Sequence, residues 1–256
     1  MKNSYLLISA FLLLLVSCTS ESDTTPSPEV NPKLRLIQKS ITTGWSGESV
    51  TSVWNYDGQK LVSIISDNGS EQHFTYNDNL IVSVESSNEF GEVTTDSYEY
   101  DDQGRITTHL DISADWGRKQ VYEYAPDGSI SVTQYFGSDE SQTQIVMQGV
   151  LLMQNGEITH TKTLNVDSGY GRICDYTYDT HNTPTRNIIG YDKISSLLST
   201  NQKGIFHNVL TNTQTTEGQD PVLVTKTYVY DSLDFPLRIV SSDPLDGDSG
   251  ITEYIY

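Results

Sequence analysis

Apolar and polar residues alternate along most of the chain, with the period of two that is typical of β-strands. In the clearest stretch, Tyr98 and Tyr100 lie on one face of an expected strand, which ends at Asp101. Gly104 then supplies the positive φ of a type I turn with a bulge, and Ile106 begins the return strand. This stretch therefore predicts a β-hairpin.

The same hairpin pattern recurs along the chain in copies of unequal clarity. Residues 122–130 repeat it in full, and residues 176–179 and 228–231 repeat its first strand. In the latter two copies, Asn182 and Asp234 occupy the glycine position, and both residue types tolerate the left-handed region better than most. The second tyrosines of the copies recur every 20 to 28 residues or so once worn copies are included, which indicates a repeat architecture.

Turn-forming residues of a second kind lie between these copies. They occur at 67–69, 88–91, 115–117, 137–139, 167–169 and 217–218. Turns that alternate between two ends, about every 12 residues, are typical of an antiparallel meander. We expect an all-β domain of about fifteen strands, and a sheet of that width curls or closes into a half-barrel or a barrel.

One interruption of the alternation, near residues 187–198, predicts a short helical or irregular insertion. Asp192 is the expected N-cap of a short helix. Ile194, Leu197 and Leu198 would share one face of that helix. We expect this segment to cover the apolar face of the curled sheet. The alternative is an irregular surface loop.

The hairpin core at 100–105, Tyr-Asp-Asp-Gln-Gly-Arg, resembles the YD repeat of Rhs-type secreted proteins, and the resemblance extends approximately over residues 50–256. The chain is more similar to a group of short secreted lipoproteins from the Bacteroidetes, which are described as porin-like in fold. In that group an Asn-x-Pro stretch and Gly-Tyr-Asp-Lys-like residues interrupt the repeats, as at 182–184 and 190–193 here. The resemblance implies a fold and a cell-envelope location, and it brings no assigned function.

The beginning of the chain has the organisation of a lipoprotein leader. Residues 1–17 carry Lys2 and an apolar run too short to span a bilayer, and we interpret them as a signal peptide. The sequence Leu-Val-Ser-Cys ends at Cys18, the expected lipidation site and link to the membrane. Residues 18–32 have the composition of a disordered tether, and 33–256 are expected to form a single β-repeat domain. We expect an outer-membrane lipoprotein, on the periplasmic face or the cell surface, with the surface favoured.

Composition narrows the classes of function. Acidic residues outnumber basic ones by 34 to 15, for a net charge of −19, which argues against a nucleic acid or an anionic lipid surface as partner. Cys174 shares the parity of Tyr176 and Tyr178, so we expect it to be a buried apolar filler. The histidines lack metal-ligand spacing, and the sequence shows no nucleophile elbow or phosphate loop. We therefore expect no cofactor, no metal site and no catalytic residue.

Aromatic residues at equivalent repeat positions form the candidate ligand face. The candidates are Trp54, Tyr56, Tyr76, Tyr98, Tyr100, Tyr122, Tyr124, Tyr178 and Tyr230. In a meander of constant register, their rings form rows on one face of the sheet. The rows either build the core or bind a ligand such as a glycan. Because a phenol needs a polar partner, we expect the hydroxyl groups to lie at a rim.

The function that these features favour is binding or scaffolding without catalysis. We expect a lipid-anchored module of the cell envelope, with a glycan or an envelope protein as its partner. The alternative is a glycan-active enzyme that uses carboxylate chemistry, because a catalytic pair of acids is recognised by its separation in space and not by a sequence motif.

Overall fold

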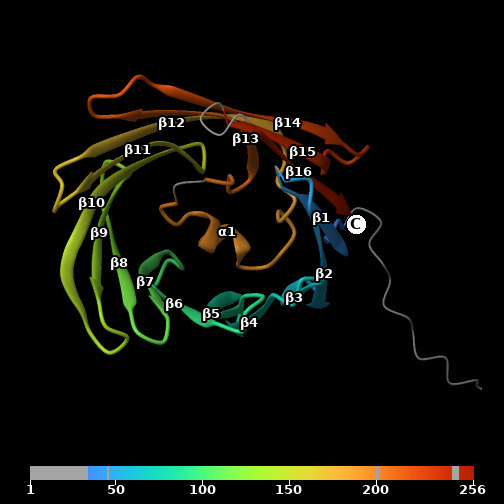
Figure 1. Ribbon diagram of the computed structural model, residues 1–256, viewed down its shortest axis with the longest axis horizontal. Helices are drawn as coiled ribbons and strands as arrows, with labels where there is room; N and C mark the ends of the chain where they lie inside the picture. The colour runs from blue at the N-terminus through green and yellow to red at the C-terminus, as the bar shows by residue number, and fades with distance from the viewer. Residues whose placement is uncertain (1–33, 45, 200–201, 244–247) are drawn as a thin grey trace, which may run out of the picture. The chain divides into compact units, whose positions relative to one another are not determined.

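The computed structural model describes residues 34–44, 46–199, 202–243 and 248–256. These residues form sixteen antiparallel strands that follow one another around a closed barrel, with β1 paired to β16 (Figure 1). The all-β meander expected from the alternation is therefore confirmed, and of the two expected shapes the barrel is the one observed. The strands are β1 (Lys39–Thr43), β2 (Ser49–Asp57), β3 (Lys60–Ser66), β4 (Glu71–Asn77), β5 (Leu80–Ser87), β6 (Val93–Tyr100), β7 (Ile106–Ile112), β8 (Gly117–Tyr124), β9 (Ser129–Gly137), β10 (Gln142–Gln154), β11 (Glu157–Asn165), β12 (Gly171–Asn182), β13 (His207–Thr216), β14 (Val222–Tyr230), β15 (Pro236–Asp243) and β16 (Asp248–Ile255).

The hairpin turns define two ends of the barrel. The repeat-turn end, as we call it, carries the turns 57–60, 77–80, 101–105, 125–129, 154–157 and 231–235. The open end carries the turns 66–71, 87–93, 112–117, 137–142, 165–171 and 216–222. Gly104 has a φ of 69° and Asp234 a φ of 64°, which confirms the left-handed conformation expected at these repeat positions. Asn182 differs from the expectation, because it ends β12 with strand geometry where the chain leaves the wall.

The described residues between β12 and β13, 183–199 and 202–206, lie inside the ring of strands, and we call them the plug (Figure 1). The plug contains the helix α1 (Tyr191–Ser195), so the expected short insertion is confirmed, and no helix in the described part of the chain is long and apolar enough to cross a bilayer. Gly190, at a φ of 76°, holds the N-cap position that we expected for Asp192. A Cβ at Gly190 would lie 2.7 Å from the carbonyl oxygen of Asn79, so this approach to the wall requires glycine.

The core of the protein lies inside the barrel, where inward residues of the wall and apolar residues of the plug bury one another. The wall contributes Ile81, Val84, Tyr98, Ile106, Tyr122, Ile130, Val132, Leu151, Ile158, Tyr176 and Val209, and the plug contributes Ile194, Leu197, Leu198, Ile205 and Phe206. Cys174 belongs to the same cluster, which confirms its expected burial. The inward repeat positions therefore build an apolar core around the plug.

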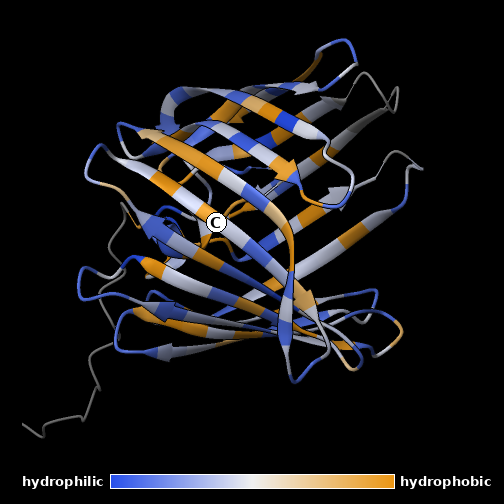
Figure 2. Ribbon diagram, turned by 90° about the vertical axis from the view of Figure 1, so that its left-hand side faces the viewer, coloured by the Kyte–Doolittle hydropathy of each residue, from blue (hydrophilic) through white to orange (hydrophobic). Residues whose placement is uncertain are grey.

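Hydrophobic and hydrophilic residues alternate along the strands of the barrel (Figure 2), and the exposed outer positions include both kinds. Val53 and Val229 are exposed on the outer face. Charged side chains stand beside them in the middle of strands, and His160 of β11 bonds Asp175 of β12 across the ladder at 2.7 Å. Among the described residues, the outward positions therefore form no continuous apolar band.

Candidate functional site in the barrel interior

The aromatic residues of the candidate ligand face point into the barrel, where Tyr98 and Tyr122 are buried and the others are half-buried. Most of them pack against the core cluster around the plug. Tyr230 stacks on His181, with 4.1 Å between the ring centroids. Trp54 differs from the others, because it lies towards the open end and donates its indole N–H to Ser40 at 3.0 Å.

Several of the tyrosine hydroxyl groups bond to the backbone of the wall, where we expected them to lie at a rim. Tyr100 donates to the carbonyl oxygen of Ile81 at 2.5 Å, and Tyr124 donates to that of Ile106 at 2.9 Å. Both carbonyls lie beside the bulge of the preceding hairpin, where the ladder register shifts. The same bond recurs at Tyr178 with Ile158, Tyr228 with Val209 and Tyr256 with Pro236. Because a bulge leaves backbone groups without ladder partners, this bond explains why the repeat uses tyrosine and not phenylalanine.

The plug is fixed to the wall by buried polar groups. The carboxylate of Glu157, only 3% exposed, accepts the backbone amides of Ile205 at 2.8 Å and of Phe206 and His207 at 2.7 Å. The hydroxyl of Tyr122 accepts the amide of Leu198 at 3.1 Å. These bonds satisfy backbone donors that the plug, as an irregular segment, cannot pair within itself.

Further bonds tie the plug to the repeat-turn end. The hydroxyl of Tyr76 donates to the carbonyl oxygen of Ile189 at 3.2 Å and accepts the amide of Leu61 at 3.1 Å. Burial raises the pKa of Tyr76 to about 12, so this phenol stays protonated and able to donate at neutral pH. The plug therefore occupies most of the half of the barrel next to the repeat turns, apart from a cavity of about 290 Å³ beside the turns 101–105 and 125–129, and we call it the plugged half.

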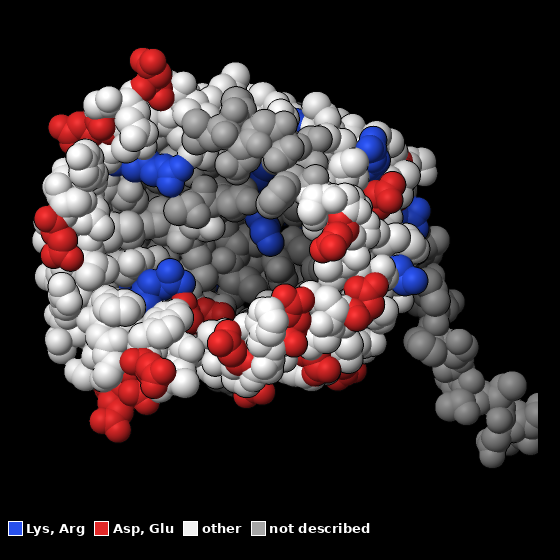
Figure 3. Space-filling view, viewed as in Figure 1, with Lys and Arg blue, Asp and Glu red and all other residues white. Residues whose placement is uncertain are grey.

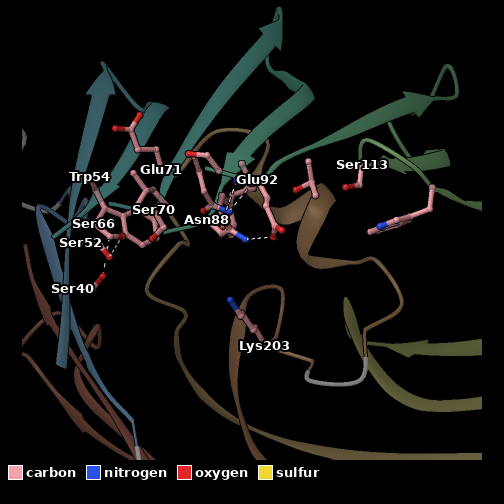
Figure 4. Close-up of a pocket in the computed structure, with 17 residues that line it drawn as sticks. Ser40, Ser52, Trp54, Ser66, Ser70, Glu71, Asn88, Glu92, Ser113 and Lys203 are labelled. Atoms are coloured by element: carbon pink, nitrogen blue, oxygen red, sulfur yellow. Dashed lines mark hydrogen bonds between the residues drawn. The ribbon is translucent and has the colours of Figure 1, made fainter. Parts of the chain in front are cut away.

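The other half of the barrel is hollow. A chamber of about 540 Å³ lies between the plug and the wall at the open end (Figure 4). Most of the residues that line it carry a hydroxyl or an amide group, and these include Ser40, Ser52, Ser66, Ser86, Gln72 and Thr94. Trp54 of β2 and Trp116 of the open-end turn 112–117 supply indole rings. Lys203 of the plug lies opposite Trp54 and the other labelled wall residues (Figure 4). The chamber is thus polar, with a few aromatic surfaces.

Two further cavities lie on the same inner surface. One, of about 340 Å³, is lined by Arg118, Arg172, His109, Gln120 and Gln134 among others, and we call it the arginine cavity. The other, of about 380 Å³, shares Lys203, Ser40 and Trp54 with the chamber and adds Lys226. The pKa of Lys226 is lowered to about 8, first by burial and then by the charge of Lys203. Figure 3 shows the hollow with basic side chains on its wall and acidic side chains around the outside.

Polar contacts hold the charged groups of the arginine cavity in place. Arg118 donates to Asp111 at 2.5 Å, and Arg172 donates to the amide oxygen of Gln214. His109 bonds Asp96 at 2.6 Å. Burial, then the neighbouring charge of Asp96, raises the pKa of Asp111, and the adjacent Arg118 opposes that shift. The carboxylates therefore lie behind the arginines, and the guanidinium groups face the cavity.

Of the residues that line these cavities, Trp54 was a candidate from the sequence. The serines, Arg118, Arg172, Lys203 and Lys226 were not. A signal for the basic residues was nevertheless present, because side-chain parity is a property of the strand. Arg118 shares the parity of Tyr122, Arg172 that of Tyr176, and Lys226 that of Tyr228. A basic residue in register with inward tyrosines marks a polar stretch of the inner wall.

Cys18 and the expected signal peptide and tether lie outside the described residues. Within the described part of the chain, no cluster of three or more His, Cys, Asp or Glu side chains is arranged to hold a metal ion.

Comparisons with known proteins give the fold. No family model matches the chain. No curated protein matches it either. Among solved structures, a porin-like protein from Bacteroides vulgatus is similar over 86% of this chain and 98% of that chain, with 11% sequence identity and a TM-score of 0.58.

A second porin-like protein, from Bacteroides uniformis, is similar over 86% of this chain and 96% of that chain, with 12% identity and a TM-score of 0.50. At these identities the likeness establishes the architecture alone. The relation to YD repeats and the lipid anchor stay predictions. The chain thus shares its fold with porin-like barrels from Bacteroides, as its resemblance to porin-like secreted proteins led us to expect.

Proposed function

We propose that the protein is a non-enzymatic binding protein of the cell envelope, which holds a polar ligand in the chamber at the open end of its barrel. One observation carries the proposal: the plug fills half of the barrel and leaves a polar chamber of about 540 Å³ in the other half. This volume lies within the range of small-molecule sites, roughly 300–1,000 Å³. A glycan fits the lining best, because hydroxyl groups match its hydroxyls and the rings of Trp54 and Trp116 offer flat surfaces for stacking.

The proposed envelope location rests on the Leu-Val-Ser-Cys motif that ends at Cys18 and on the charged residues of the barrel's outer face. A transmembrane barrel presents an apolar band to lipid, and charged outward residues are costly there. Here Asp175 and His160 pair in the middle of two outward-facing strand segments. A barrel that stands beside the bilayer and is tethered through Cys18 accounts for both features.

The alternative function, a glycan-active enzyme, finds less support in the chamber. Catalysis by two carboxylates needs an acid on each side of the bond that breaks. Among the described residues that line the chamber, the carboxylates are Glu71 and Glu92. Glu71 pairs with His73 at 3.0 Å and Glu92 accepts the side-chain amide of Asn88 at 2.7 Å, both on the exposed mouth of the chamber. We therefore propose binding and not hydrolysis.

The binding proposal is tested by filling the chamber. Ser52 faces the chamber, and the next residue on β2, Val53, is exposed on the outside, so the two positions are matched. The full chain, solubilised in a mild detergent, is screened against an array of neutral and acidic oligosaccharides. We expect at least one glycan to bind the parent and Val53→Tyr, and to lose binding in Ser52→Tyr. Absence of binding across the array, or binding that survives Ser52→Tyr, contradicts the proposal.

The anchor proposal is tested by removing the thiol that would be acylated. Cys18→Ser is expected to release the protein from the membrane fraction, because the acyl chains attach at this residue. Cys174→Ser, a substitution of the buried thiol in the barrel, is the control and is expected to stay with the membranes. Co-fractionation of Cys18→Ser with membranes, to the same extent as the parent, contradicts a lipid anchor.

A further inference from the structure

We propose that the arginine cavity is an anion-binding subsite, in which Arg172 and Arg118 recognise a carboxylate or sulfate group of an acidic glycan. The proposal rests on the function proposed above and narrows it from a polar ligand to an acidic one. It names a charged group on the ligand and the two side chains that recognise it, and it leaves the remainder of the ligand in the adjoining chamber.

The distribution of charge is the first argument. The chain carries 34 acidic residues against 15 basic ones. Among the described residues that line the arginine cavity, however, there are Arg118, Arg172 and His109 and no carboxylate. The cavity surface is therefore more basic than the molecule as a whole, although Asp111 and Asp96 pair with two of its basic groups. Basic groups between low-dielectric walls favour ligands of the opposite sign.

The unused donors of the two arginines are the second argument. Each guanidinium is anchored by one bond, from Arg118 to Asp111 and from Arg172 to Gln214. In the described part of the structure, the Nε atoms of both arginines are buried and have no hydrogen-bond partner. A buried donor without a partner is destabilising, and a bound ion or water is a usual explanation for one in a native protein. An oxyanion that meets the guanidinium fork supplies the missing acceptor.

The two arginines are not equivalent. Asp111 offsets much of the charge of Arg118, whereas the anchor of Arg172 is the neutral amide of Gln214. Arg172 therefore provides the larger attraction for an anion, and Arg118 provides geometry. The neighbouring Gln120 and Gln134, joined by a hydrogen bond of 3.0 Å, line the same cavity and offer neutral polar contacts to a sugar ring.

The test compares an acidic probe with its neutral counterpart. Trigalacturonic acid and its full methyl ester differ in charge and share the same sugar skeleton. Affinities of the full chain in detergent are measured by calorimetry, with inorganic sulfate as a competitor. The matched variants are Arg172→Gln in the cavity and Arg238→Gln on the exposed outer face of β15, each checked for an unchanged melting temperature.

We expect the acid to bind at least about tenfold more tightly than the ester, and sulfate to compete with it. Arg172→Gln should lose that factor of about ten, and Arg238→Gln should retain it, since one bidentate charged contact is lost in the first variant alone. If Arg172→Gln does not fold like the parent, Arg172→Lys keeps the charge and removes the fork, and a several-fold loss is expected. Equal affinities for acid and ester, indifference to Arg172, or no affinity for the acid and for sulfate each overturn the anion subsite. A neutral glycan whose binding is abolished by Ser52→Tyr would leave the chamber proposal standing after such a result.

Discussion

The two halves of the barrel interior are built from the same strands and differ in what the inward positions carry. In the plugged half, inward positions of neighbouring strands carry tyrosine and isoleucine, such as Tyr122 of β8 and Ile130 of β9. These side chains pack in the core around the plug. In the open half, the same strands continue with inward serine, glutamine and arginine, as at Arg118 on β8. Apolar inward residues are stabilised when a segment of the chain covers them, whereas polar inward residues line a cavity that water or a ligand fills.

This difference between the two halves shows how one repeat contributes to both stability and function. Several hairpin repeats supply the turn, the bulge and a tyrosine whose hydroxyl satisfies the bulge of the neighbouring hairpin, as Tyr124 does for Ile106. These features all lie at the repeat-turn end. In the described part of the chain, the bonds between tyrosine hydroxyls and wall carbonyls that the structure shows lie at the repeat-turn end, and the open end is not held by them. Residues of the open half are therefore free to serve a ligand.

The largest contrast is expected at alkaline pH. Burial raises the pKa of Tyr98 and Tyr122 above that of an exposed phenol, and both belong to the plugged half. Above pH 10 the unfolded chain loses tyrosine protons that the folded protein keeps. The free energy of unfolding therefore falls with rising pH, by about 1.4 kcal/mol per pH unit for each such tyrosine.

The open half changes the free energy of unfolding with pH in the opposite direction and by a smaller amount. Because the pKa of Lys226 is lowered to about 8, the folded protein binds fewer protons than the unfolded chain between there and about 10.5, which raises stability with pH over that interval. This is one group against several tyrosines. Urea midpoints measured from pH 8 to 11 are expected to fall steeply above pH 10. A midpoint that stays constant to pH 11 contradicts the burial of the tyrosine rows.

Truncation of an aromatic side chain sharpens the same comparison. Tyr122→Ala is expected to cost about 3–5 kcal/mol, because the ring is buried and its hydroxyl accepts the amide of Leu198 in the plug. Trp116→Ala at the open end removes a half-buried ring that stacks on Phe136, and about 1 kcal/mol is expected. Chemical denaturation of both variants gives the two values. Equal losses would show that the halves are packed alike.

Removal of a carboxylate in each half gives a second pair of variants that compares the stability of the two halves. Glu157→Ala leaves the amides of Ile205 and Phe206 in the plug and of His207 at the start of β13 without their acceptor, and it is expected to cost about 3 kcal/mol or more. Glu92→Ala, at the exposed mouth of the chamber, is expected to stay within about 0.5 kcal/mol of the parent. The comparison fails if the Glu157 variant unfolds at the same urea concentration as the Glu92 variant.

The smallest effect is expected at a repeat turn. Gly104→Val places a β-branched residue at a φ of 69°, and about 1–2 kcal/mol is expected from the strain. Gln103→Val at the neighbouring turn position, where φ is not positive, is the control and is expected to cost less than about 0.5 kcal/mol. Identical melting temperatures for the two variants would argue against the left-handed turn.

Local patterns in the sequence were sufficient for the strands and turns. Alternation at Tyr98 and Tyr100, with Gly104 after it, predicts a hairpin because each signal acts within a few residues. Closure of the barrel depends on pairs such as Lys39 with Ile255, which lie at opposite ends of the chain and leave no local trace. The cap at Gly190 was missed for the same reason, since the wall at Asn79 excludes a side chain there.

The candidate site was partly within reach of the sequence. The parity of Arg118 and Arg172 with the inward tyrosines was readable, but their meaning depends on the plug stopping short of the open end. The aromatic rows attracted attention because they repeat. The residues that line the cavities show no repeated pattern in the sequence, because the polar residue differs from strand to strand, as with Ser52, Gln72 and Arg172.

The central claim, a packed core around the plug beside a solvent-filled chamber, is tested most directly by the reactivity of single thiols. In a chain with Cys18→Ser and Cys174→Ala, a cysteine is placed at Ser86 in the chamber or at Val132 in the core of the plugged half, which is 1% exposed. Labelling with a maleimide is followed by mass spectrometry under native conditions. We predict that Ser86→Cys reacts at nearly the rate of the unfolded chain, and that Val132→Cys reacts only as fast as the protein unfolds. Equal native rates at the two positions would contradict the division of the barrel into two halves.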